Sequence, residues 1–242
     1  GIMLLNDLYE IVAQFSNVLV LIAGRNTQQW YEKFCEEMAD ECVTLPLQPF
    51  TLDDSQTYLE QKQQILKVTF DKKWVHKLFI LAGGLPVLID LAIEWAQYHR
   101  ELPGMDEVSL SDETSASQLS ELQERFKKML VMPIASLDYS LDRLKLVLSK
   151  VYPLDIEGIM EMLDVNHYDA GRLFDEALRS VTIKNLPDGR IKLHDEVEHL
   201  INEYVWPLLD KNRQWEQRDS RRAVTYLTRK SNALLDELRE LK

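Results

Sequence analysis

The sequence has almost no cysteine and no long apolar run, and both shortages exclude whole classes of protein. Its 242 residues include two cysteines, Cys35 and Cys42, which make neither a disulfide framework nor the ligand spacing of a zinc site. No apolar run reaches the roughly 18 residues that a membrane span needs. No basic segment followed by a short apolar segment marks a secretory signal. We therefore expect a cytoplasmic protein whose thiols stay reduced.

The sequence also lacks a phosphate-binding loop. That loop has the pattern Gly-x4-Gly-Lys-Ser/Thr, and none of the eight glycines begins it. In such a loop, backbone N–H groups and the lysine hold the β- and γ-phosphates of a nucleotide. We therefore expect no backbone cradle for phosphates within these residues.

The charge of the chain is strongly negative but uneven. The formal net charge is −12, although residues 211–242 hold nine basic and five acidic residues. An acidic body repels the phosphate backbone of nucleic acids, so nucleic acid is not an expected partner. Three interpretations of the basic segment stay open: it docks on the acidic body, it binds another protein, or it is a solvated helix of mixed charge.

Three short apolar runs predict strands of a parallel sheet. Residues 2–5 and 18–23 are continuous rather than alternating, which is typical of strands covered on both faces. Residues 43–45 predict a third strand, after a helix over residues 28–40. The connection between the first two runs is tight, because a parallel crossover usually needs about a dozen residues. These runs indicate part of an α/β core.

A series of helices without strands follows. Two prolines keep residues 46–50 extended, and Thr51 caps a helix that has two acids in its first turn. Residues 71–82 predict a second helix, which two glycines end. Residues 86–98 predict a third helix that begins with proline. Several short helices in series indicate a helical lid.

The second half of the chain has a different rhythm. Helices are predicted over residues 141–151, 156–163 and 168–180. Two β-prone runs then flank Pro187-Asp188-Gly189, and Asp-Gly between such runs is a strong hairpin signal. Three helices followed by a hairpin predict a winged-helix domain.

Together these segments predict an α/β plus mainly α fold in five parts. Residues 103–120 contain five serines and little periodicity, which indicates a linker. The parts are a partial core with a parallel sheet (1–50), the helical lid (51–102), a linker and helix (103–135), the winged-helix domain (136–210) and a basic C-terminal helix (211–242).

Four segments also carry a family resemblance. They are residues 2–10, an apolar strand that ends in acids; Gly24-Arg25, which follows the second strand; residues 47–51 together with 83–86; and residues 193–195, Leu-His-Asp, on the second hairpin strand. In this combination the chain resembles the STAND class of AAA+-related signal-transduction ATPases. That group includes apoptotic protease activators, plant disease-resistance proteins and bacterial regulators. The resemblance implies a P-loop NTPase core, a helical lid and a winged helix.

The resemblance assigns roles to the first two segments. It implies that Asp7 is the Mg²⁺ ligand at the end of a Walker B strand, and that Glu10 orients the attacking water. A carboxylate suits Mg²⁺, which prefers hard oxygen ligands. Arg25 is similar to the sensor arginine that grips a γ-phosphate. The structural alternatives are a turn for Asp7 and a surface ion pair for Arg25.

The remaining segments are implied to bind the nucleotide from other sides. Gly84 and Pro86 resemble the lid turn that packs beside adenine and ribose. His194 resembles the histidine of a Met-His-Asp motif, which touches the β-phosphate of ADP, although Leu193 stands where the family has Met. The structural alternative for His194 is a cap on the helix that follows.

The function implied is a nucleotide-dependent switch in signalling or transcriptional regulation, with ATP or ADP and Mg²⁺ as cofactors. Either the phosphate-binding loop lies upstream of Gly1, which we expect, or the protein is a degenerate relative that lacks it. We expect slow ATP turnover by the complete module and an inactive chain without the loop. Protein partners or self-association are expected. Two alternatives stay open: an interaction module without nucleotide, and a winged-helix DNA-binding regulator. Acids outnumber arginines on residues 168–180, which disfavours the latter.

Overall fold

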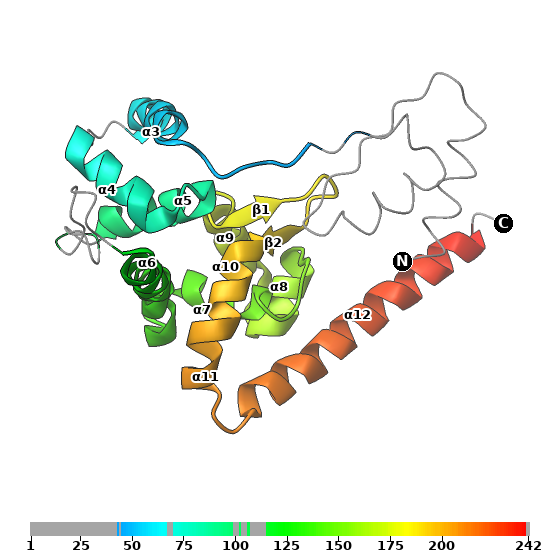
Figure 1. Cartoon of the computed structure of the whole chain (residues 1–242). Coiled ribbons are helices and arrows are strands. Elements are labelled where there is room, and N and C mark those ends of the chain that lie inside the picture. The colour runs from blue at the N-terminus through cyan, green and yellow to red at the C-terminus, as the bar shows by residue number, and fades with distance from the viewer. Residues whose placement is uncertain are drawn as a thin grey trace, which may run out of the picture. The chain divides into compact units, whose positions relative to one another are not determined.

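The computed structural model describes residues 43, 45–66, 70–98, 102, 106 and 115–240. The chain divides into two units, residues 1–48 and residues 49–242, and almost all described residues belong to the second. Figure 1 shows this second unit as a series of helices with one hairpin among them. The expected mainly helical character is therefore confirmed for the described part of the chain.

Most of the predicted α/β core lies outside the described residues, including the strands at 2–5 and 18–23. Val43 and Leu45, from the third predicted strand, are described. Neither is in a strand, and they are 81% and 77% exposed. The prediction of a covered strand is therefore wrong at these two residues. A strand needs a hydrogen-bonded neighbour, and the described strands pair with each other instead.

The first described helix, α3 (Leu52–Leu66), begins where the sequence predicts it. The Thr51 hydroxyl accepts a hydrogen bond from the Asp54 N–H at 3.1 Å, and the Asp54 carboxylate accepts one from the Thr51 N–H at 2.9 Å. This reciprocal pair satisfies two N–H groups that a helix start leaves without partners. The capping role predicted for Thr51 is confirmed.

Helices α4 (Lys72–Ala82) and α5 (Pro86–Tyr98) also match the prediction. Asp71 caps α4 by accepting from the Trp74 N–H at 2.7 Å. Gly83 ends α4 in the left-handed conformation, with φ of 58°. The inward faces of both helices carry fully buried leucines, among them Leu78 and Leu88.

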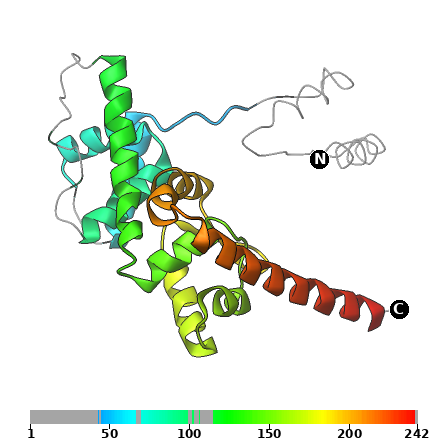
Figure 2. The same ribbon diagram turned by 90° about the horizontal axis from the view of Figure 1, so that it is seen from below.

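Helix α6 (Ala116–Val131) corrects the predicted linker, because residues 116–120 are helical. Ser115 and Gln118 form a capping box, so a serine that suggested a loop marks a helix start instead. Figure 2 shows α6 alongside α4 and α5, against both of which it packs. A short 3₁₀ helix, η1 (Met132–Ser136), follows and contains Pro133.

The next elements match the predicted three helices and hairpin. The helices are α7 (Ser140–Leu148), α8 (Ile156–Leu163) and α9 (His167–Ala177). Strands β1 (Ile183–Asn185) and β2 (Ile191–Leu193) pair antiparallel, with Ile183 opposite Leu193. Leu154, between α7 and α8, forms an additional antiparallel bridge with Ile191. The hairpin therefore has a third, single-residue partner that the sequence did not predict.

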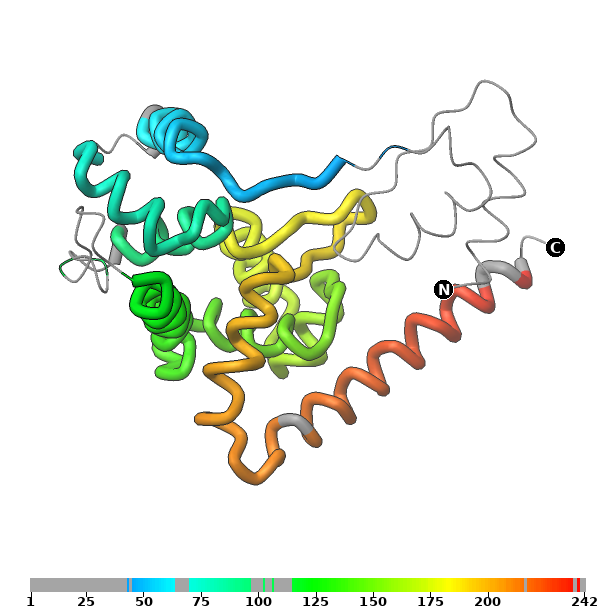
Figure 3. The backbone as a smooth tube through the Cα atoms, in the orientation of Figure 1, coloured from blue at the N-terminus to red at the C-terminus, as the bar shows by residue number. Residues whose placement is uncertain are grey.

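Four helical segments follow the hairpin in the described residues. They are α10 (Asp195–Leu200), a π-helical turn η2 (Ile201–Val205), α11 (Trp206–Leu209) and α12 (Gln214–Glu240). The Trp206 indole donates to the Ser149 hydroxyl at 2.7 Å, which joins this segment to the end of α7. Figure 3 shows the turn at which the chain reverses from α11 into α12. None of the helices in the described residues is both long and apolar enough to cross a membrane.

Candidate functional site

The turn between α4 and α5 holds two of the predicted site residues, Gly84 and Pro86. Gly84 has φ of 70°, which favours glycine, and its carbonyl accepts a hydrogen bond from the Phe50 N–H at 2.8 Å. A Cβ at Gly84 would lie 2.3 Å from the Phe50 carbonyl oxygen. The backbone that precedes α3 therefore occupies the space that a side chain at position 84 would need. Gly84 fastens the start of the predicted lid to its turn.

The neighbouring residues stabilise the same turn. Pro86 is the first residue of α5, a position where its missing N–H costs no helix hydrogen bond. The Gln123 amide, from α6, donates to the Ile80 carbonyl at 2.7 Å, and so satisfies a carbonyl near the end of α4. Hydrogen bonds from the Phe50 backbone and from the Gln123 side chain of α6 therefore hold this turn in place.

The hairpin end holds the third predicted residue that is described, His194. Its N–H donates to the Thr182 carbonyl at 2.8 Å, which extends the hairpin pairing by one position. Leu193 is buried and His194 is half-buried, as strand alternation predicts. His194 occupies the N-cap position of α10 but makes no side-chain cap hydrogen bond. The alternative that His194 caps this helix is therefore confirmed for its backbone position but not for its side chain, and the role of the imidazole stays a prediction.

Two lysines and one acid surround this hairpin end, and they are not among the site residues predicted from the sequence. Lys184 and Lys192 lie directly opposite each other on β1 and β2, a pairing of like charges that is unfavourable by itself. Asp195 offsets part of this repulsion, with carboxylate oxygens 3.0 Å from the Lys192 ammonium and 3.6 Å from the Lys184 ammonium. The alternating pattern places Lys192 and His194 on one face of β2. That face of the hairpin is basic within an acidic chain.

A chain of polar contacts links the hairpin to helix α5. The hydroxyls of Thr182 and Ser180 lie 2.7 Å apart, and the Ser180 hydroxyl also donates to the Glu94 carboxylate at 3.4 Å. The other oxygen of Glu94 pairs with the Lys145 ammonium of α7 at 2.9 Å. Thr182, whose carbonyl accepts the hydrogen bond from the His194 N–H, is therefore connected through Ser180 to Glu94 of α5.

Lys145 was also missed, although the sequence carries a signal for it. It interrupts the run Leu144, Leu146, Val147 and Leu148, all of which are buried. A lysine inside such a run needs a buried partner, because an unpaired buried charge is costly. What the sequence does not reveal is that the partner lies 51 positions earlier, on α5.

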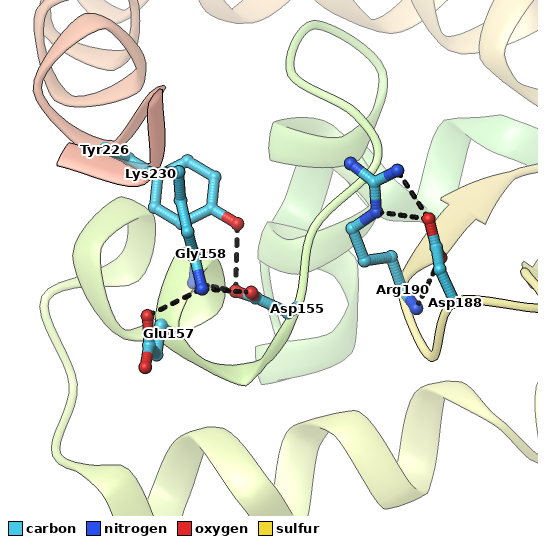
Figure 4. A network of polar contacts seen from close by, with 7 residues as sticks. All are labelled: Asp155, Glu157, Gly158, Asp188, Arg190, Tyr226 and Lys230. Atoms are coloured by element: carbon cyan, nitrogen blue, oxygen red, sulfur yellow. Dashed lines mark hydrogen bonds and ion pairs between the residues drawn. The ribbon is translucent and has the colours of Figure 1, made fainter. Parts of the chain in front are cut away.

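A second polar cluster fastens α12 to α8, as Figure 4 shows. The Tyr226 hydroxyl donates to the Asp155 carboxylate at 2.9 Å, and the Lys230 ammonium lies 2.8 Å from both Asp155 and Glu157. A Cβ at Gly158 would lie 3.0 Å from the Tyr226 ring, so glycine lets the ring pack closely. This cluster joins the start of α8 to the middle of α12.

The cluster shifts the pKa values of its members. Burial alone would raise the pKa of Asp155, but Lys230, the Gly158 N–H and Tyr226 together lower it below its usual range. Burial and the hydrogen bond to Asp155 raise the pKa of Tyr226 to about 12. The two acids raise the pKa of Lys230. These directions all correspond to a network that holds Asp155 and Lys230 charged and Tyr226 neutral.

Further ion pairs follow along the same interface. Arg222 pairs with Asp164 at 3.1 Å, and Arg229 pairs with Glu161 at 3.3 Å. Docking of the basic segment on the acidic body, one of the three open interpretations, is therefore confirmed. Between α8 and α12 lies an open groove of about 830 Å³, whose lining includes Met160, Val165, His167 and Ala233.

The remaining predicted site residues, Asp7, Glu10 and Arg25, lie outside the described residues. Within the described part of the chain, no group of three or more His, Cys, Asp or Glu side chains is placed to hold a metal ion. Of the predicted nucleotide contacts, the structure thus locates Gly84 and Pro86 in one turn and His194 at the hairpin end.

Comparison of the chain with known protein families, with curated proteins and with solved structures finds no match.

Proposed function

We propose that these residues form the sensor, lid and winged-helix part of a nucleotide-dependent molecular switch of the STAND type. The fold proposed for the complete module is a P-loop NTPase core followed by the helical lid and the winged helix. The proposal requires a phosphate-binding loop in addition to these residues, since none of the eight glycines begins one. The module acts in signalling or transcriptional regulation, through protein partners or self-association.

The observation that carries the proposal is the contact between Phe50 and Gly84. The resemblance assigns the segment around Phe50 to the start of a lid and the segment around Gly84 to its turn. These segments are 34 positions apart, yet their backbones are hydrogen-bonded at 2.8 Å. Two motifs chosen only by sequence therefore belong to one local structure, as a lid requires.

The hairpin region gives a second line of support. The order helix, single-residue bridge, helix, helix, hairpin is typical of a winged helix, in which a short strand between the first two helices pairs with the wing. The face that carries Lys184, Lys192 and His194 offers donors to an anionic oxygen, and a phosphate bound there would replace the Asp195 carboxylate that pairs with both lysines.

In this proposal each residue has a defined task in a closed state. Asp7 holds Mg²⁺, and Glu10 orients a water molecule for slow ATP hydrolysis. Arg25 contacts the γ-phosphate, and His194 donates to the β-phosphate. Gly84 and Pro86 place the lid backbone beside the base and ribose. Nucleotide exchange would then release the winged helix from the core, a rigid-body transition that ATP turnover times.

Calorimetric titration with Mg²⁺-ADP tests this proposal. The 242 residues alone are expected to bind weakly and to hydrolyse no ATP, whereas the same residues with a phosphate-binding segment supplied upstream of Gly1 are expected to bind at micromolar concentration or below. Equal affinity of the two proteins would contradict the assignment of a missing loop. Failure of both proteins to bind would contradict the switch itself.

One observation favours the second candidate, an interaction module that uses no nucleotide. Helix α12 exposes Val224, Leu227 and Leu234 on one side, at spacings that suit a helical partner. Capture of a protein partner that is unaffected by ADP, ATP and Mg²⁺ would favour this candidate. The DNA-binding alternative is disfavoured by α9, on which Asp175 and Glu176 are exposed beside Arg172.

A further inference from the structure

Lys145 has two acidic residues within reach, one on another helix and one on its own. Its ammonium is hydrogen-bonded to Glu94 of α5 at 2.9 Å, and their side chains are only 8% and 21% exposed. Asp142 lies three positions before Lys145 on α7 and is itself buried. Residues three apart on a helix are neighbours, so Asp142 is placed to be an alternative partner for this lysine.

The Asp142 carboxyl is in an unfavourable environment while Lys145 is engaged by Glu94. Burial raises the pKa of Asp142, the charge of Lys145 and a backbone hydrogen bond with Tyr139 oppose this increase, and the charges of Glu94 and Asp138 add to it. One lysine therefore lies near two acids, and in this structure it is paired with Glu94 rather than with Asp142. Removal of Glu94 from this cluster would relieve Asp142 and leave it as the partner of Lys145.

We infer that Glu94, Lys145 and Asp142 form a latch in which Lys145 exchanges partners. Lys145 of α7 binds Glu94 while α5 is in place, and it turns to Asp142 when α5 moves away from α7. A buried ion pair that loses one partner is ordinarily very costly, because a buried charge is left uncompensated. The second acid removes most of that cost, so the contact can open without unfolding α7.

The position of the latch indicates a regulatory role. Glu94 lies on α5, which belongs to the predicted lid, whereas Lys145 and Ser180 lie in the predicted winged-helix domain. Opening would separate the predicted lid from the predicted winged-helix domain, the part that the proposed switch releases from the core, and this regulatory role rests on the proposed function. The contact itself involves no nucleotide and is tested without one.

Hydrogen exchange of the 242-residue chain, followed peptide by peptide, tests the latch. Glu94→Gln is expected to raise exchange in α5 by about tenfold, equivalent to about 1.4 kcal/mol, and to leave α8 and α12 unchanged. Asp142→Asn is expected to have the opposite effect. It removes the competing partner, and exchange in α5 falls by about twofold or more, the scale of an ion pair between neighbouring helical positions.

The control is Asp175→Asn, which removes an exposed acid from α9 and is expected to leave α5 unchanged. The double variant Glu94→Gln with Asp142→Asn leaves Lys145 without either partner and should melt below both single variants. Faster or unchanged exchange in α5 of Asp142→Asn would overturn the latch. So would an increase spread equally over α5, α8 and α12 in Glu94→Gln, because it would signify a loss of global stability. Neither result would bear on nucleotide binding by the complete module.

Discussion

The backbones of Gly84 and Phe50 lie so close together that no side chain fits between them. The Phe50 N–H donates to the Gly84 carbonyl at 2.8 Å, and a Cβ at Gly84 would lie 2.3 Å from the Phe50 carbonyl oxygen. Gly84 also has φ of 70°. The segment that leads into α3 is therefore tied to the α4–α5 turn by a glycine that is required for two independent reasons.

Replacement of this glycine should destabilise the chain more than replacement of a glycine with conformational strain alone. Gly84→Ala is expected to lower the free energy of unfolding by about 3 kcal/mol, because both the left-handed backbone and the Phe50 backbone oppose a Cβ. Gly189→Ala is the matched control. Gly189 has φ of 78° but nothing within 4 Å of an added Cβ, so Gly189→Ala should lower the free energy of unfolding by about 1 kcal/mol. Urea unfolding of both variants measures the difference, and equal losses would contradict the steric account.

The hydrogen bond between Tyr226 and Asp155 should make the docking of α12 sensitive to alkaline pH. Tyr226→Phe is expected to lower stability at neutral pH by about 2 kcal/mol, the scale of a hydrogen bond to a charged group. The folded state raises the pKa of Tyr226 from 10.0 to about 12. A raised pKa gives stability that is complete below the unfolded value near 10 and is lost as the pH rises through about 12.

The measurement for Tyr226 is the melting temperature between neutral pH and pH about 12, with and without the substitution. Wild type should lose part of its stability across the alkaline range, and Tyr226→Phe should lose less. Tyr168→Phe changes a tyrosine that is 80% exposed and serves as the control, with no expected effect at either end. A Tyr226→Phe profile parallel to wild type would contradict the role of the hydroxyl.

The sequence was a good guide to local structure in this chain. The cap at Thr51, the stop at Gly83 and the hairpin around Asp188-Gly189 are each determined by a few neighbouring residues. Ser115 was misinterpreted for the same local reason, since a serine suits a loop and a helix cap equally. Strand predictions were weaker, because a strand such as that expected at Val43 depends on a distant neighbour.

The candidate site was predicted only where the signal is local. Gly84 and His194 stand in recognisable turns and strand ends, and their positions follow from the sequence. Lys145 and Glu94 meet across 51 positions, and no pattern of spacing identifies such a pair. The same is true of Tyr226 and Asp155, which are 71 positions apart. Long-range polar partners are determined by packing, which the linear pattern does not encode.

Arg25 provides a test that separates the two nucleotide states. In the 242 residues with a phosphate-binding segment supplied upstream, Arg25→Ala is expected to weaken ATP binding by about 1.5–3 kcal/mol and ADP binding much less, because only ATP has a γ-phosphate. Calorimetry with both nucleotides measures the two losses. Arg190→Ala, which removes an arginine that pairs with Asp188 in the hairpin turn, should change neither affinity. Equal losses for ATP and ADP would assign Arg25 a structural role.

The rate of ADP release from the same complete module tests the central claim most directly. If His194 donates to the β-phosphate in the closed state, His194→Ala should speed ADP release by about tenfold, with little change in melting temperature without nucleotide. His199→Ala is the control, because this second histidine of the region has a side chain that is 64% exposed and pairs with Glu203. Faster release from His194→Ala alone is the result that the switch predicts. Unchanged release, together with a lower melting temperature without nucleotide, would contradict the switch and leave His194 a structural residue of the hairpin.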